Sequence, residues 1–254
     1  MSKIDLELQL SSYDYPLPAG LIAKRPVAVR DESRLLVYDR KTEMVTHTKF
    51  SDLPTFLPRK SLLVLNRSRV FPCRLIGQKS SGARYELLLL SPTGRKGDDS
   101  STIVPALIRS ARRKREGEQV LLEEGGVATI LERREDGTFL VEINQYPLID
   151  YLKRVGRVPI PPYIRAGESD LQDQTDYQTV YAKEVGSVAA PTAGLHFTPE
   201  LLERVESETA GIASVTLHVG VGTFAPVNQE IITDHQMHQE HFWVDQENLA
   251  KITA

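Results

Sequence analysis

Short apolar stretches separated by tight turns fill the middle of this 254-residue chain. Gly125-Gly126 and Asp136-Gly137 stand between successive stretches, and such pairs form two-residue hairpin turns in which both central positions favour positive φ. Five or six closely spaced strands joined in this way predict a small antiparallel β-barrel between residues 70 and 146. The expected strands cover residues 85–90, 102–108, 118–122, 127–131 and 138–143.

The segments on either side of this run have a mixed pattern. Residues 35–38 and 61–65 read as buried strands, and residues 148–155 have the apolar spacing of a helix. Thr198-Pro199-Glu200 supplies a helix cap, a first-turn proline and an acid at the positive helix end. We therefore predict a mixed α/β (α+β) fold, in which a larger discontinuous α/β domain (1–69 and 147–254) is interrupted by a β-barrel domain (70–146).

Composition narrows the class of protein. The formal net charge is −3, so any contact with nucleic acid must come from a local basic patch. Cys73 is the one cysteine, which rules out a disulfide within the chain. The N-terminus lacks the pattern of a signal peptide, and no apolar run reaches the length of a membrane span. We expect a cytoplasmic protein without membrane contact.

A run of small residues between Glu184 and His196 is the first candidate site. Little bulk lets the backbone approach a ligand closely, and the run ends in an ionisable group. The alternative is a tight packing crossover between a helix and a sheet.

Gly220 and Gly222 follow an expected strand over residues 212–219. A dinucleotide-binding turn is rejected, because the third glycine is missing and Pro226 would interrupt the helix that must follow. We favour a strand end that a ligand approaches, with His218 and Thr223 nearby; the alternative is a β-bulge without a ligand.

Three histidines and a glutamate crowd into residues 235–241. His235 and His238 at i, i+3 on a helix could share a metal, but the spacing matches neither HExxH nor a cysteine-assisted site. We expect polar contacts or acid/base work, and no metal.

Residues 109–115 carry five positive charges in seven positions. A solvated charged face explains most runs of this kind. In an otherwise acidic chain this run is nevertheless the best candidate for phosphate contact.

Several segments together resemble the S-adenosylmethionine:tRNA ribosyltransferase-isomerase family of queuosine biosynthesis. They occur in family order and span nearly the whole chain. The long central match is specific, because a string with so little bulk rarely arises by chance. The matching segments are DYPLPAGLIAKRP, RDESRLLV, LVLNRSRV, YQTVYAKEVGSVAAPTAGLHFT, VTLHVGVGTFAPV and HQMHQE.

The resemblance implies a reaction on tRNA that carries 7-aminomethyl-7-deazaguanine at the wobble position of GUN anticodons. S-adenosylmethionine is consumed as the ribosyl donor, and the products are epoxyqueuosine in tRNA, adenine and methionine. It also implies a larger α/β domain with an inserted β-barrel. We expect the chain to work as a monomer.

The chemistry needs a base to remove a proton beside the sulfonium, an acid for the departing adenine, and exclusion of water. We expect the donor between residues 186–196 and 218–224. The catalytic candidates are His196, His218, His235 and His238. The candidates for binding the donor or the target base are Tyr177, Gln178, Tyr181, Ser187, Thr192, Gly194, Gly220, Gly222, Thr223 and Phe224. The tyrosines could equally pack a helix. The candidates for RNA contact are Arg67, Arg69, Arg109, Arg112, Arg113, Lys114 and Arg115.

Three departures from the family pattern leave alternatives open. Asp176 stands where arginine is usual, and Arg67 and Ser68 replace an acid and a threonine. The chain stops at Ala254, where the family continues through a further α/β segment. A catalytically impaired tRNA-binding homologue and an enzyme of the same fold acting on another nucleoside are therefore the competing hypotheses.

Overall fold

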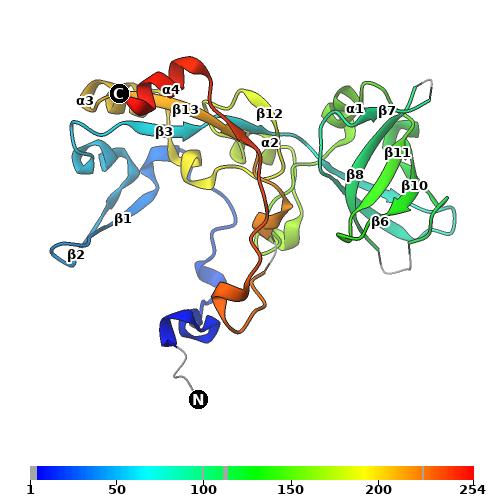
Figure 1. Cartoon of the computed structure of the whole chain (residues 1–254), viewed down its shortest axis with the longest axis horizontal. Coiled ribbons are helices and arrows are strands. Elements are labelled where there is room, and N and C mark those ends of the chain that lie inside the picture. The colour runs from blue at the N-terminus through cyan, green and yellow to red at the C-terminus, as the bar shows by residue number, and fades with distance from the viewer. Residues whose placement is uncertain (1–4, 99, 111–113, 225) are drawn as a thin grey trace.

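A computed structural model describes residues 5–98, 100–110, 114–224 and 226–254. Figure 1 shows a β-barrel beside a mixed α/β part, with the chain passing into the barrel after β4 (Ser68–Val70) and returning through α1 (Leu148–Val155). The predicted mixed α/β fold with an antiparallel β-barrel is confirmed.

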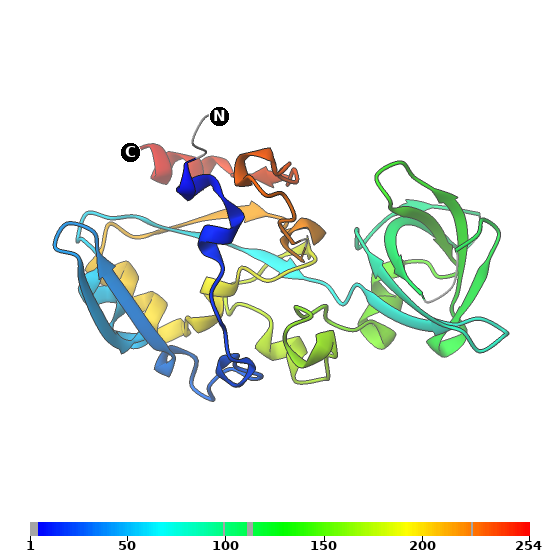
Figure 2. The ribbon, with the colours of Figure 1, turned by 90° about the horizontal axis from the view of Figure 1, so that it is seen from below.

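The barrel is a ring of six antiparallel strands in the order β11-β10-β9-β5-β6-β8, closed by pairing of β11 with β8. Figure 2 looks into this ring. Buried and partly exposed residues alternate along the strands, as in β8, because successive side chains point to opposite faces. The strands are β5 (Arg74–Gln78), β6 (Arg84–Leu89), β8 (Thr102–Arg109), β9 (Gln119–Leu122), β10 (Val127–Arg133) and β11 (Phe139–Ile143), and β7 (Arg95–Lys96) adds to β8.

Helix α1 (Leu148–Val155) buries its apolar residues, including Tyr151, in the barrel core. The Tyr151 hydroxyl donates to the Glu123 carbonyl (2.7 Å). A Cβ on Gly126 would lie 2.1 Å from that hydroxyl oxygen. Gly126 is therefore required for close approach.

The predicted turn geometry was wrong at both glycine pairs. At the first pair, positive φ falls on Glu124 (50°) and Gly125 (74°), whereas Gly126 has a φ of −66°. At the second pair only Gly137 (84°) has a positive φ. The physical reason at the first turn is the packing of Tyr151, which the local sequence does not contain.

The mixed part is built on short parallel pairings. β3 (Leu63–Asn66) runs parallel to β13 (Ile212–Leu217), whose other edge carries β14 (Phe242–Trp243). β4 (Ser68–Val70) pairs in parallel with β12 (Glu184–Ser187). Because β3 and β4 are consecutive, residues 66–70 connect the two small sheets. Besides short 3₁₀-helices, the described residues also form the hairpin of β1 (Arg34–Asp39) and β2 (Met44–Lys49), and the α-helices α2 (Asp173–Asp176), α3 (Pro199–Glu208) and α4 (Gln246–Thr253).

Helix α3 begins as its sequence predicts. The Thr198 hydroxyl accepts a hydrogen bond from the Leu201 amide (3.2 Å), and Pro199 occupies the first turn. Leu201 and Val205 are buried with Phe50 and other apolar residues in a second core. Of the helices in the described ranges, none combines the length and the apolar content needed to cross a bilayer.

Candidate functional site at the junction of barrel and mixed part

Asn66, the last residue of β3, holds two chain segments together. Its side-chain oxygen accepts from the amides of Ser68 and Leu217 (both 3.0 Å), and its amide nitrogen donates to the Leu217 carbonyl (2.8 Å). The end of β13 is thereby fixed against the start of β4. This clamp sets the positions of Ser68 and of His218, the residue after β13.

The His218 ring is held from three directions. Its Nδ1 lies 2.6 Å from the hydroxyl oxygen of Ser68, which is fully buried. The ring of Trp243 meets it edge-on, with centroids 4.8 Å apart. On the other side a Cβ on Gly186 would lie 2.3 Å from Nε2, so only glycine leaves room for the ring.

Burial is the main reason why the pKa of His218 lies below its ordinary value, with a smaller effect in the same direction from His241. The carboxylate of Glu184 acts on this pKa in the opposite direction. His218 is therefore mostly neutral at neutral pH.

His218 lines a cavity of about 400 Å³ where the barrel meets the mixed part. Ser91, Pro92 and Thr93 come from the barrel. The Glu240 carboxylate in its wall accepts from the Gly220 amide (2.9 Å). The mixed part supplies Val185, Gly186, Val188, His218, Val219, Gly220, Gln239, Glu240 and His241.

The run of small residues serves two purposes. Gly186 makes room for His218, whereas the Ser187 hydroxyl donates to the Ala189 carbonyl (2.9 Å) and accepts from the Val219 amide (2.8 Å). Thr192 is exposed, and a Cβ on Gly194 would lie 2.0 Å from the Tyr181 hydroxyl oxygen. The first part of the run therefore borders the cavity, and the rest packs against neighbouring segments.

His196 lies in a different environment. Its Nδ1 is 3.0 Å from the Ser33 hydroxyl oxygen, and its ring contacts Phe50 with centroids 5.3 Å apart. Burial, with the positive charge of Arg30 as a smaller cause, lowers its pKa. His196 does not line the junction cavity.

The three side chains proposed to meet the target base are engaged within the protein. Tyr177 is buried in a third core beside Val70, and Tyr181 packs edge-on against Phe197. Burial raises the pKa of each tyrosine to about 12. The Gln178 amide accepts from the Val70 amide and donates to the Val70 carbonyl (both 3.0 Å).

The remaining candidates lie on the segment that follows Gly220 and on the segment that precedes Gln239, and these two residues line the cavity. Gly222 and Thr223 belong to a 3₁₀-helix over Val221–Phe224. A Cβ on Gly222 would lie 2.4 Å from the ring of His238. His238 is exposed, and His235 is half-buried after the 3₁₀-helix Ile232–Asp234.

Comparison with known proteins identifies the family. The model described as "Queuosine biosynthesis protein" matches residues 10–254. The S-adenosylmethionine:tRNA ribosyltransferase-isomerases of Trichlorobacter lovleyi and Geotalea uraniireducens are 43% and 40% identical over 96% and 97% of this chain, and it covers 70% and 71% of theirs. The chain belongs to the queuosine biosynthesis protein family.

A crystal structure of S-adenosylmethionine tRNA ribosyltransferase from Thermotoga maritima is 31% identical, with a TM-score of 0.38. The match covers 95% of this chain and 64% of that chain. The family model and the two named relatives confirm the predicted family membership, and this chain spans about 70% of the length of those relatives.

Two departures from the family pattern have structural partners. Arg67 donates to the Thr216 hydroxyl (3.1 Å) and pairs with Asp245 (3.0 Å). Asp176 lies 3.7 Å from the Arg25 guanidinium and accepts from the Gln172 amide (3.0 Å). The Asp176 carboxylate is therefore partly neutralised within the protein. Arg69, by contrast, is exposed on β4.

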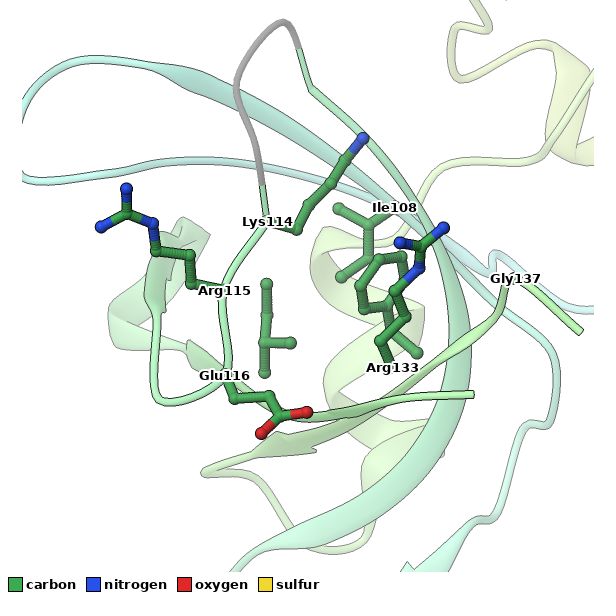
Figure 3. A pocket seen from close by; sticks show the side chains of 8 residues that line it. Ile108, Lys114, Arg115, Glu116, Arg133 and Gly137 are labelled. Atoms are coloured by element: carbon green, nitrogen blue, oxygen red, sulfur yellow. The ribbon is translucent and has the colours of Figure 1, made fainter. Parts of the chain in front are cut away.

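The basic run of this family member divides between two cavities. Lys114 and Arg115 stand at a cavity of about 740 Å³ in the barrel, where Arg133 lies across from them (Figure 3). Ile108, Ile130 and Phe139 form its apolar wall, and Glu116 is its acidic residue. Arg109 instead lines a second cavity with Arg74, Arg84 and Glu86. Arg112 and Arg113 lie outside the described residues.

Sequence reasoning assigned no role to two supporting residues, Asn66 and Ser68. Glu240 and Gly186 were noted only as members of the histidine-rich segment and of the run of small residues. Asn66 and Ser68 gave no local signal, since their partners are about 150 positions away.

Proposed function

We propose that this chain transfers and isomerises the ribosyl group of S-adenosylmethionine onto 7-aminomethyl-7-deazaguanine in tRNA. The observation that carries the proposal is the match to named ribosyltransferase-isomerases over 96% of the chain. The products would be epoxyqueuosine in tRNA, adenine and methionine, and the chain would act as a monomer. The same proposal includes two domains: a discontinuous α/β domain of residues 1–69 and 147–254, and an inserted β-barrel domain of residues 70–146.

We propose the junction cavity as the place of the reaction. Its volume of about 400 Å³ falls within the roughly 300–1,000 Å³ of small-molecule sites. Gly220 leaves backbone accessible there, because a Cβ on it would meet its first neighbour only at 4.0 Å, whereas Gly186 makes room for the His218 ring. These features suit S-adenosylmethionine as a substrate, which supplies an activated ribosyl group through its sulfonium.

The side chains around the cavity suit the proton transfers that this reaction requires. His218 is held by Ser68 and has a pKa lowered by burial, and Glu240 and His241 stand in the same wall. We infer that acid/base work falls to these residues, with His235 and His238 on the neighbouring segment. His196 lies outside the cavity, and its contacts with Ser33 and Phe50 would stabilise the segment that follows the run of small residues.

We propose that tRNA contacts the barrel through Lys114, Arg115 and Arg133. Three basic side chains and one acidic side chain line this open cavity. None of the three basic side chains forms a salt bridge with another residue that the structure describes. Phosphate groups are the complementary ligand for such a surface.

The test is release of adenine from S-adenosylmethionine in the presence of tRNA that bears 7-aminomethyl-7-deazaguanine. We expect adenine only with the modified tRNA. Folded protein that binds this tRNA but releases no adenine would instead establish the impaired-homologue hypothesis. Adenine release with unmodified tRNA or with none would indicate another nucleoside acceptor.

A further inference from the structure

Two histidines of this chain each have a serine hydroxyl beside Nδ1. Ser68 lies 2.6 Å from Nδ1 of His218, and Ser33 lies 3.0 Å from Nδ1 of His196. A hydroxyl has one hydrogen to donate and two lone pairs that accept, whereas a neutral imidazole has one nitrogen of each kind. The other partner of each serine therefore decides which ring nitrogen carries the hydrogen.

The two serines differ in that second partner. The Ser33 hydroxyl donates to the Arg30 carbonyl (2.8 Å), so His196 must donate from Nδ1 and its Nε2 is left without hydrogen. The fully buried Ser68 hydroxyl has no second partner among the described residues. A buried hydroxyl hydrogen without an acceptor is costly, and the lone pair of Nδ1 is the available acceptor.

We propose that Ser68 is a positioning residue, which donates its hydrogen to Nδ1 of His218 and so keeps hydrogen on Nε2. His218 then presents a hydrogen-bond donor to the junction cavity, the reverse of the arrangement at His196. The atom it would meet is an acceptor of the bound nucleoside, such as a ring nitrogen of the departing adenine. This assignment rests on the proposed function, and it leaves removal of the ribose proton to another residue.

The surroundings keep the ring from turning over. A flip about the Cβ–Cγ bond would move Nδ1 away from Ser68, and the close approach of Gly186 and the edge-on contact with Trp243 leave the ring little room to turn. The ionisable groups that act on His218 are Glu184 and His241, with opposite effects on its protonation, and Glu240 shares the cavity wall. None of these three replaces the acceptor or donor at Nδ1.

Nitrogen-15 NMR of histidine-labelled protein tests the assignment directly. The resonances of His218 and His196 are identified by their loss in His218→Gln and His196→Gln. Near pH 8 we expect an unprotonated Nδ1 in His218 and an unprotonated Nε2 in His196. In Ser68→Ala the His218 signals should shift toward a mixture of tautomers while those of His196 stay unchanged. A protonated Nδ1 in wild-type His218 would overturn the proposal, as would unchanged signals in Ser68→Ala.

Kinetics supply a second readout. Ser68→Ala should lower kcat for adenine release roughly tenfold with little change in KM, and Ser68→Thr, which keeps the hydroxyl, should restore most of it. Equal kcat in wild type and folded Ser68→Ala would also overturn the role. Wild-type protein that releases no adenine would refute the proposed function, whereas the NMR result would still decide the tautomer.

Discussion

Replacing Gly186 by alanine tests whether the position of His218 matters for the reaction. The new Cβ would lie 2.3 Å from Nε2, whereas ordinary contact begins at 3.4 Å, so the ring must move by about 3.4 − 2.3 = 1.1 Å. Overpacking of this kind costs roughly 1–3 kcal/mol of stability. Misplacement of a reacting group by about 1 Å can lower the rate by about 100-fold. We therefore expect a folded protein with a strongly reduced rate.

The assay is the initial rate of adenine release at saturating S-adenosylmethionine, measured beside the thermal unfolding curve of each variant. Gly20→Ala is the matched control, because its Cβ would meet nothing within 4 Å and Gly20 also lacks a positive φ. Its rate and its Tm should stay close to those of the wild type. A folded Gly186→Ala protein with a rate within about threefold of the wild type, well short of the loss expected from misplacement, would refute the reasoning.

Three further predictions concern other parts of the molecule. Gln178→Ala should lower the free energy of unfolding by roughly 2–4 kcal/mol in urea titrations, because two buried backbone groups of β4 lose their partners. Gln172→Ala at the surface should change it by less than about 0.5 kcal/mol, and equal losses in the two variants would contradict the prediction. Arg133→Ala should reduce the slope of log affinity for tRNA against log salt concentration by about one. Arg134 lines a different cavity, so Arg134→Ala should keep the steeper slope of the wild type, and equal slopes in the two variants would mark the barrel cavity as a solvated surface. Because the pKa of His196 is lowered in the folded protein, the unfolded chain binds the proton more tightly, and stability falls as the pH drops below about 6.5. In unfolding measured from pH 8 to 5, His196→Gln should flatten this pH dependence of stability, and an unchanged dependence would exclude His196 as its source.

Local pattern predicted those elements whose causes lie within a few residues. The barrel strands follow from alternating apolar residues and nearby turns, and α3 follows from its cap at Thr198. The role of Gln178 could not be read in this way, because the strand that it bonds is 108 positions earlier in the chain. Its neighbour Tyr177 carries the same lesson, since an aromatic residue in a polar segment fits stacking on a base as well as burial in a core.

The histidines show where composition alone stops being informative. His196 and His218 have the same side chain, a serine at Nδ1 and a pKa lowered mainly by burial. They differ in whether the serine has an acceptor of its own and in whether the ring borders a cavity. Both differences arise from tertiary contacts.

If the reaction takes place in the junction cavity, as proposed, the barrel has a role in it. Residues 91–93 of the barrel form one wall, and the strand ends that carry Gly186 and His218 form another. Neither part encloses the space alone, because both contribute residues to its lining. The barrel would therefore complete the donor site at one place and offer Lys114, Arg115 and Arg133 to RNA at another. Binding of tRNA along the barrel would then place the RNA on the same part of the molecule that supplies residues 91–93 to the wall of the junction cavity.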